Sequence, residues 1–120
     1  MGSRLIMTTH KNLYEQWITR LWAGEPVAAE LVTDDFVGHW PDREVHGPAE
    51  LQAIIEQTHK MLSDLTFEIE LGPFVDGDMV AGRWVGSGTG EQGPMRFTGN
   101  DILRVADGKF AEYWTGTSTS

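Results

Sequence analysis

Apolar residues in the first half of the chain recur at the spacing of amphipathic helices. Between residues 10 and 23 they return every third or fourth position, which predicts a first helix; these positions are Leu13, Tyr14, Trp17, Ile18, Leu21 and Trp22. Gly24 caps the end of that helix, and a short second helix is expected at 26–32. A third is expected at 49–62, after Pro48, whose missing N–H costs nothing in the first turn of a helix.

The second half of the chain alternates apolar and polar residues, which is the pattern of strands with one face in water. Strands are expected at 65–71, 79–89, 95–105 and 110–115, and a shorter one at 36–40 before the third helix. Asp76-Gly77-Asp78 and Asp107-Gly108 have the composition of hairpin turns. Polar loops are expected at 41–47 and 90–94. Helices followed by strands predict an α+β fold, in which the sheet curls around the helices and leaves a cavity.

The length of 120 residues favours a single domain, which we place at residues 10–116. Residues 1–9 begin like an expression tag, and we expect them to form a disordered N-terminal segment. Residues 117–120 are expected to be a frayed tail.

Charge and composition exclude several classes of function. The chain has 18 acidic and 9 basic residues, a formal net charge of −9, and its Lys and Arg residues are scattered singly. Nucleic acids and anionic membranes bind clustered cations, so we expect neither as a partner. There is no cysteine and no long apolar run, so disulfides, thiolate sites and a membrane-spanning helix are not expected. We therefore expect a cytoplasmic protein.

Motifs for metals and cofactors are also missing. The four histidines have no paired spacing, which argues against a metal site. The glycines at positions 82 to 93 lie on an expected strand and loop rather than before a helix, so they do not form a phosphate-binding motif. We expect no metal and no cofactor.

Several segments resemble the SnoaL-like polyketide cyclase family of the nuclear transport factor 2-like superfamily. They are 21–25 (LWAGE), 35–39 (DFVGH) followed by 47–51 (GPAEL), 76–84 (DGDMVAGRW), and 97–105 (FTGNDILRV) with the DGK and EYW that follow. The resemblance implies a cone-shaped fold, with N-terminal helices packed on a curved mixed or antiparallel sheet around a pocket for a small hydrophobic molecule. It also implies a homodimer formed through the sheet and chemistry without a cofactor.

Asp101 is the first candidate for catalysis. It lies on an expected strand, and the residues that share its face at period two include Phe97, Gly99, Leu103 and Val105. Ionising a carboxyl group on an apolar face is costly, so we expect a raised pKa and a role as general acid or base. The resemblance implies the same, because related cyclases and isomerases have an acid–base or oxyanion-binding Asp at this place. The alternative is a structural Asp bonded to a nearby Trp, His or backbone N–H.

His39 is the second candidate, at the end of the short expected strand beside Trp40. A neutral imidazole there could relay a proton or orient a substrate oxygen. The resemblance implies that a histidine at this place reaches the mouth of the pocket, where it could pair with Asp101. The alternative is a buried histidine whose hydrogen bonds are satisfied within the core.

The aromatic residues are candidates for the walls that bind the substrate. They are Tyr14, Trp17, Trp40, Trp84, Phe97, Tyr113 and Trp114. Tyr14 and Trp17 lie on a helix face, where aromatic residues more often belong to the core. A two-residue turn at Asp107-Gly108 would place Trp114 opposite Asp101, and a bulge would place Tyr113 there instead.

Three functional hypotheses follow from these residues. The first is a cofactor-free enzyme of the cyclase or isomerase type, which acts on a small hydrophobic carbonyl or polyketide-like compound, with Asp101 shuttling a proton and His39 assisting. The second is a non-catalytic protein that binds a small molecule in the same pocket. The third is a structural dimer that uses its outer sheet face. Trp40 stands where the resemblance places the base of ketosteroid isomerases, which disfavours steroid isomerisation.

Overall fold

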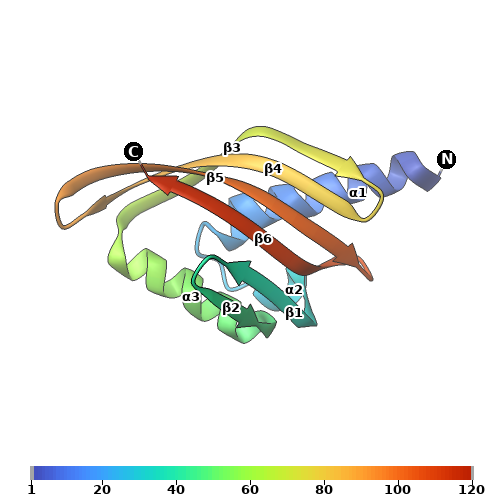
Figure 1. The fold of residues 1–120 in the computed structure, drawn as a ribbon, viewed down its shortest axis with the longest axis horizontal. Coiled ribbons are helices and arrows are strands. Elements are labelled where there is room, and N and C mark those ends of the chain that lie inside the picture. Colours follow the sequence, from blue (N-terminus) through green and yellow to red (C-terminus); the bar gives the residue numbers. More distant parts are fainter. Residues whose placement is uncertain (1, 120) are drawn as a thin grey trace.

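A curved six-stranded sheet forms the body of the protein, and the helices cover one of its faces (Figure 1). The computed structural model describes residues 2–119, and the side chains within 5–117. The helical elements are α1 (Gly2–Gln16), the π-helical turn η1 (Trp17–Leu21), α2 (Ala28–Leu31) and α3 (Gly47–Met61). The strands are β1 (Val32–Trp40), β2 (Arg43–His46), β3 (Ser63–Asp76), β4 (Met79–Gly90), β5 (Gly93–Ala106) and β6 (Lys109–Thr119).

The sheet is mixed. Its strands lie in the order β2-β1-β6-β5-β4-β3. β1 runs parallel to β6, and every other neighbouring pair is antiparallel. The prediction of an α+β fold with helices packed on a curved mixed sheet is therefore confirmed.

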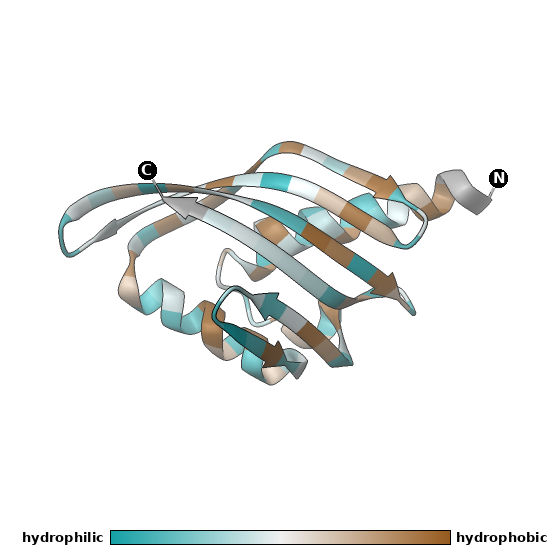
Figure 2. Cartoon of the chain, viewed as in Figure 1, coloured by the Kyte–Doolittle hydropathy of each residue, from teal (hydrophilic) through white to brown (hydrophobic). Residues whose placement is uncertain are grey.

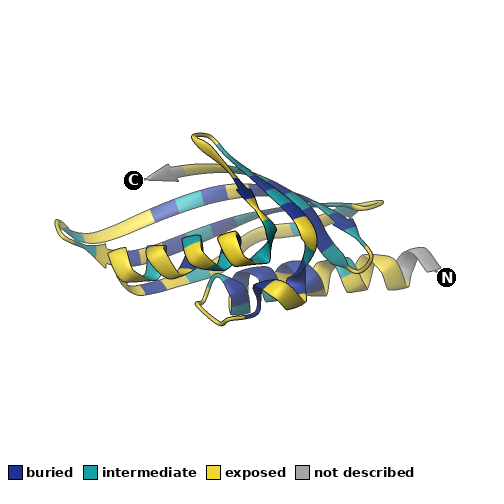
Figure 3. Ribbon diagram, turned by 90° about the horizontal axis from the view of Figure 1, so that it is seen from below, coloured by how far each residue is buried: buried dark blue, intermediate teal, exposed yellow. Residues whose placement is uncertain are grey.

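The core lies between the helices and the concave face of the sheet. Hydrophobic and hydrophilic residues alternate along the strands, and the buried positions of the sheet face α1 and α3 (Figures 2 and 3). Trp17 is fully buried there, with its ring centroid 6.2 Å from that of Phe36 and 5.5 Å from that of Phe110. These contacts tie η1 to β1 and β6, two neighbouring strands of the sheet.

The two ends of the described chain are more regular than the sequence analysis expected. Residues 2–9 continue α1, where we expected a disordered segment, because nothing in that stretch interrupts a helix. Leu5 and Ile6 are exposed on this extension. At the other end, β6 continues to Thr119 and pairs with β5, where we expected a frayed tail from residue 117. Met1 and Ser120 lie outside the described residues.

Two expected loops also differ from the structure. The segment 41–47 contains the strand β2, which pairs with β1. Only Val45 of β2 is buried, so its alternation is too short to be recognised in the sequence. The expected loop at 90–94 is a tight turn, since β4 ends at Gly90 and β5 begins at Gly93.

Two glycines on the concave face allow aromatic side chains to lie directly against the strands. A Cβ atom at Gly82 would lie 2.6 Å from the ring of Tyr14, and one at Gly99 would lie 2.2 Å from Cζ2 of Trp84. Contacts this short do not occur between real Cβ atoms and their neighbours, so both positions require glycine. The missing side chains bring Tyr14 and Trp84 close to β5, where Asp101 pairs with Gly82.

Candidate active site

Asp101 lies in the middle of β5 and faces the concave side of the sheet. Only 1% of its surface is exposed, and it is the one charged residue that is buried within the described part of the chain. Its neighbours at period two, Gly99 and Leu103, are also buried. The inward orientation predicted from the strand pattern is therefore confirmed.

Three neutral donors hold the carboxylate of Asp101. The Tyr113 hydroxyl donates to Oδ1 at 2.7 Å, the Trp84 indole N–H donates to Oδ1 at 3.0 Å, and the Tyr14 hydroxyl donates to Oδ2 at 3.1 Å. A carboxylate offers about four acceptor positions. Oδ1 therefore has both of its positions filled, and Oδ2 accepts one hydrogen bond, from Tyr14.

The environment sets the protonation state of each group in this cluster. Burial raises the pKa of Asp101 to about 6, although the hydrogen bonds from Tyr113, Trp84 and Tyr14, and the nearby Trp17 indole N–H, lower it in part. Burial and the negative charge of Asp101 raise the pKa of Tyr14 and the pKa of Tyr113 well above their ordinary value. Both tyrosines therefore keep their protons at neutral pH and act only as donors to Asp101.

A pocket with a volume of about 290 Å³ opens beside this carboxylate. It is lined by Ile18, Trp22, Trp40, Ile54, Thr58, Leu62, Phe67, Trp84, Met95, Phe97, Asp101, Tyr113, Thr115 and Thr117. Most of these side chains are apolar, and Asp101 is the only carboxylate among them. Such a pocket, apolar with a few convergent polar groups, is the usual form of a small-molecule site.

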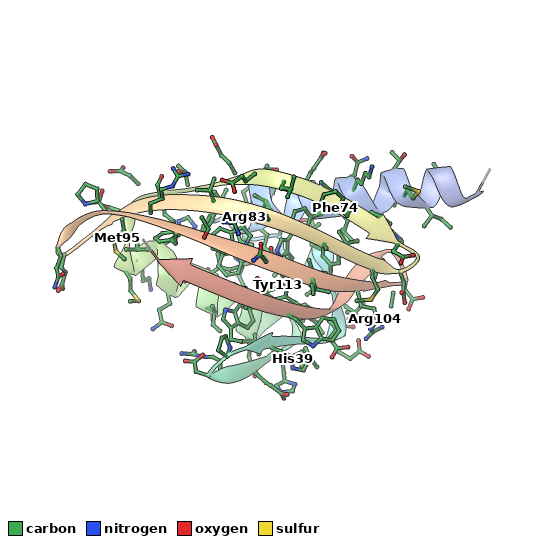
Figure 4. The ribbon with its side chains drawn as sticks, turned by 45° about the horizontal axis from the view of Figure 1, so that its top comes forward. His39, Phe74, Arg83, Met95, Arg104 and Tyr113 are labelled. Atoms are coloured by element: carbon green, nitrogen blue, oxygen red, sulfur yellow. The ribbon has the colours of Figure 1, made fainter. Side chains whose placement is uncertain are left out.

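The structure brings five of the predicted site residues together in this pocket. Asp101, Trp40, Trp84, Phe97 and Tyr113 all line it. Figure 4 shows Tyr113 on β6, in the middle of the sheet. Their roles in binding and catalysis stay predictions.

Tyr14 and Trp17, also predicted to bind substrate, are fully buried beside the pocket and do not line it. Tyr14 reaches the site through its hydrogen bond to Asp101. The buried indole N–H of Trp17 makes no well-formed hydrogen bond among the described residues, but it lies near enough to Asp101 to lower the pKa of that carboxyl. Both residues support the pocket from the core side.

His39 and Trp114 lie on the opposite, convex face of the sheet, so their predicted places in the pocket are wrong. His39 Nε2 lies 2.7 Å from Oε2 of Glu112, and the His39 ring stacks on Trp114 with a centroid distance of 5.5 Å. In Figure 4 His39 lies on β1, in the part of the sheet formed by β1 and β2. Trp40 faces inward, and its neighbour in the strand must therefore face outward.

A bulge in the β5–β6 pair explains the exchange of Trp114 for Tyr113. The register shifts between Arg104 and Val105, so that Asp101 pairs with Thr115 instead of Trp114. Tyr113 then lies on the concave face. A bulge was one of the two possibilities left open, and Tyr113 does share the face of Asp101, but the residue opposite Asp101 is Thr115, so the predicted pairing of Asp101 with Tyr113 is wrong.

Several pocket residues were not predicted. Trp22 and Phe67 are the largest of them, and their ring centroids lie 5.8 Å apart. Both belonged to predicted apolar stripes, Trp22 on the first helix and Phe67 on the first long strand. Their position on a buried face was therefore visible in the pattern, but nothing in it separated core positions from pocket positions.

The comparison with protein families identifies the chain. Residues 14–113 match the model of the SnoaL-like domain. The chain belongs to the SnoaL-like family. The match includes Tyr14 and Tyr113, the first and last residues of the cluster around Asp101. No curated protein has a sequence that matches this SnoaL-like chain significantly.

Solved structures show the same fold. A candidate SnoaL-like polyketide cyclase of Jannaschia sp. CCS1 superposes with a TM-score of 0.82 at 17% identity, over 92% of this chain and 86% of that chain. TsrD of Streptomyces laurentii superposes with a TM-score of 0.80 at 21% identity, over 92% and 89%. A candidate polyketide cyclase of Bacillus cereus ATCC 10987 gives 0.73 at 28% identity, over 92% and 72%.

Two further features bear on what this SnoaL-like protein could hold. Within its described residues, no three or more His, Cys, Asp or Glu side chains come together in a way that could bind a metal ion. None of the helices that the structure describes has the length and apolar character needed to cross a membrane. The chemistry that the pocket itself offers is proton transfer at a buried carboxylate.

Proposed function

We propose that the pocket is the active site of a cofactor-independent enzyme, which carries out acid–base chemistry on a small hydrophobic carbonyl compound. The observation that supports this most strongly is the position of Asp101, a buried carboxylate that lines a mostly apolar pocket and is the only carboxylate among its lining residues. A pKa of about 6 lets this group accept a proton near neutral pH and return it in a later step.

A cyclisation of the aldol type would use Asp101 in two steps. Oδ2 of Asp101 takes a proton from the carbon next to a carbonyl, and the resulting carbanion attacks a second carbonyl carbon of the same molecule. The oxygen of that second carbonyl then takes the proton from Asp101, which restores the carboxylate. No oxidant, reductant or second substrate is needed, and the two structural relatives described as candidate polyketide cyclases support this class of reaction.

The hydrogen-bond donors would keep the carboxyl group oriented while its charge changes. Trp84 and Tyr113 both bond Oδ1, so two donors from different strands fix the orientation of the carboxyl group. Tyr14 bonds the same oxygen that would react, so its hydrogen bond weakens the base and strengthens the conjugate acid. The apolar walls exclude water from the reacting carbon.

The second candidate is a binding protein without catalysis. The position of His39 on the other face of the sheet favours it, because the pocket then holds a single group that titrates near neutral pH. A pocket that only carries a ligand needs no second proton donor. The two candidates share the ligand site and differ only in whether Asp101 exchanges a proton with the ligand.

Deuterium exchange into a hydrophobic ketone separates the two. The protein is incubated in deuterated buffer with α-tetralone, and exchange of the hydrogens next to the carbonyl is followed by NMR. The wild type should accelerate exchange, Asp101→Asn should return it to the background rate, and Trp114→Phe on the convex face should match the wild type. Equal acceleration by Asp101→Asn would rule out this mechanism, and binding of the ketone without acceleration would favour the carrier.

A further inference from the structure

Six of the side chains that line the pocket form a closed circuit of contacts with one another. Asp101 bonds Tyr113 at 2.7 Å and Trp84 at 3.0 Å, and aromatic contacts complete the circuit. The ring centroids are separated by 5.2 Å for Tyr113 and Trp40, 6.5 Å for Trp40 and Trp22, 5.8 Å for Trp22 and Phe67, and 5.3 Å for Phe67 and Trp84. All six residues line the pocket. Five aromatic rings and one carboxylate therefore make up a continuous part of the pocket wall.

The planes of neighbouring aromatic rings in this circuit are inclined to one another. Neighbouring planes make angles of 46° at Trp22 and Trp40, and 70° at Trp22 and Phe67. The angle is 74° at Trp40 and Tyr113, and 80° at Phe67 and Trp84. Rings set at steep angles around a common space can turn their faces toward it, and the face of an aromatic ring carries negative electrostatic potential.

The charge of the pocket is also negative. No Lys, Arg or His lies among the described residues that line it, so Asp101 has no cationic partner there. The titratable groups that face Asp101 are Tyr14 from α1 and Tyr113 from β6, and both stay neutral because their pKa values are raised. A buried carboxylate without a counter-charge creates a strong local field, because the surrounding medium screens it poorly.

We propose that this pocket binds small lipophilic alkylammonium ions, with the cationic nitrogen placed among the five aromatic side chains and next to Asp101. A quaternary ammonium group spreads its charge over its alkyl substituents, so it gives up little hydration and fits apolar walls. Aromatic faces and a carboxylate both attract it. This inference goes beyond the proposed function, because cation binding needs no proton transfer, and a bound cation would compete with a carbonyl substrate for Oδ2.

Three probes of similar size and different charge test the proposal. Phenyltrimethylammonium carries the cation, tert-butylbenzene has the same shape without charge, and benzenesulfonate carries an anion. Trp22, Trp40 and Trp84 line the pocket, so tryptophan fluorescence reports binding, and calorimetry checks it. At about pH 8 the cation should bind about tenfold or more tightly than the neutral isostere, and the anion should not bind.

Acidification should weaken binding of the cation selectively. Protonation of Asp101 removes the negative charge, so the affinity should fall about tenfold between about pH 8 and about pH 5. Binding of tert-butylbenzene should not change over this range. Equal affinity for the cation and its isostere, an affinity independent of pH, or no saturable binding of the cation at millimolar concentration would each overturn the proposal.

A pair of tryptophan variants separates the pocket from the rest of the protein. Trp22→Leu removes one wall and should lower the cation's affinity about tenfold, with a smaller effect on the isostere. Trp114→Leu removes a tryptophan on the convex face and should leave both affinities unchanged. Equal losses for cation and isostere in Trp22→Leu would contradict cation–π recognition. These experiments measure binding alone. A negative result here can therefore be told apart from a ketone-exchange rate that does not depend on Asp101.

Discussion

The hydroxyl of Tyr14 donates a hydrogen bond to Oδ2 of Asp101, which lies 87 residues further along the chain, at a distance of 3.1 Å. This bond joins α1 to the centre of the sheet, and it is accepted by a different carboxylate oxygen from the one that accepts from Trp84 and Tyr113. It passes over Gly82, whose missing side chain leaves room for the tyrosine ring. The strength of the base in the pocket therefore depends on how the first helix packs against the sheet.

Removing the Tyr14 hydroxyl should make Asp101 a stronger base. In Tyr14→Phe the ionised carboxylate loses a donor, so the pKa of Asp101 should rise above its value of about 6. Loss of a buried hydrogen bond should also lower the free energy of unfolding by about 1–3 kcal/mol. Titration of the Asp101 carboxyl carbon by NMR measures the first effect, and urea unfolding measures the second.

Tyr113→Phe provides the comparison for this variant. The bond from Tyr113 is shorter, at 2.7 Å, and it lowers the pKa of Asp101 more than the other donors do. The pKa of Asp101 should therefore rise further in Tyr113→Phe than in Tyr14→Phe. A pKa that stays unchanged or falls in either variant would contradict the assignment of these hydroxyls as donors to the carboxylate.

The stability of the protein should depend on pH through Asp101. The folded pKa of about 6 lies above the ordinary value of 3.8, so the folded state binds a proton more tightly than the unfolded state does. The contribution of Asp101 to stability is thus full below about pH 4 and is lost as the pH rises through about 6. The shift corresponds to about 3 kcal/mol.

Asp101→Asn should remove this pH dependence. The side-chain oxygen of Asn can accept from Trp84 and Tyr113, and its amide can donate to the Tyr14 oxygen, so the fold should persist. The free energy of unfolding of the wild type, relative to the variant, should fall by about 3 kcal/mol between about pH 4 and about pH 7. A constant difference between the two proteins across this range would show that Asp101 is not buried as described.

The part of the site that follows strand alternation could be predicted from the sequence. Asp101 stands among apolar neighbours at period two, and this pattern alone placed it on the buried face. The order of helices and long strands was likewise visible, because each long element repeats its pattern often enough to be recognised. The short strand β2 has one buried residue and could not be recognised in this way.

The part of the site that depends on register could not be predicted. One extra residue in the β5–β6 pair puts Tyr113 rather than Trp114 on the face of Asp101, and it places Thr115 opposite Asp101, a pairing that the sequence analysis did not name. The face of His39 depends on the parallel pairing of β1 with β6, which brings together residues far apart in the chain. A shift of one residue turns every side chain of a strand to the other face, so a single uncertain bulge moves candidates into or out of the pocket.

A methyl group at position 99 should displace Trp84 from Asp101. The Cβ atom of Gly99→Ala would lie 2.2 Å from the Trp84 ring, and the backbone of β5 cannot retreat because it pairs on both sides. Overpacking of this kind should lower the free energy of unfolding by about 1–3 kcal/mol. The lost Trp84 bond should also raise the pKa of Asp101.

Gly116→Ala is the matched control. A Cβ atom at Gly116 would meet nothing within 4 Å, so this variant should unfold at the same urea concentration as the wild type or a slightly higher one. Equal stabilities of Gly99→Ala and Gly116→Ala would argue against the close approach of Trp84 to β5. Urea unfolding followed by circular dichroism is suitable for both variants, because tryptophan fluorescence would itself respond to a displaced Trp84.

Substituting His39 should alter the convex face without affecting the pocket. The hydrogen bond from His39 is the main cause of the lowered pKa of Glu112, so His39→Ala should bring that pKa back toward its ordinary value. Arg104 lowers the pKa of Glu112 less, and Arg104→Gln should therefore have a smaller effect. Ketone exchange and the pKa of Asp101 should both match the wild type in His39→Ala, because His39 and the pocket lie on opposite faces of the sheet. Loss of exchange in a folded His39→Ala protein would restore His39 as a candidate for catalysis and would require a different arrangement of β1.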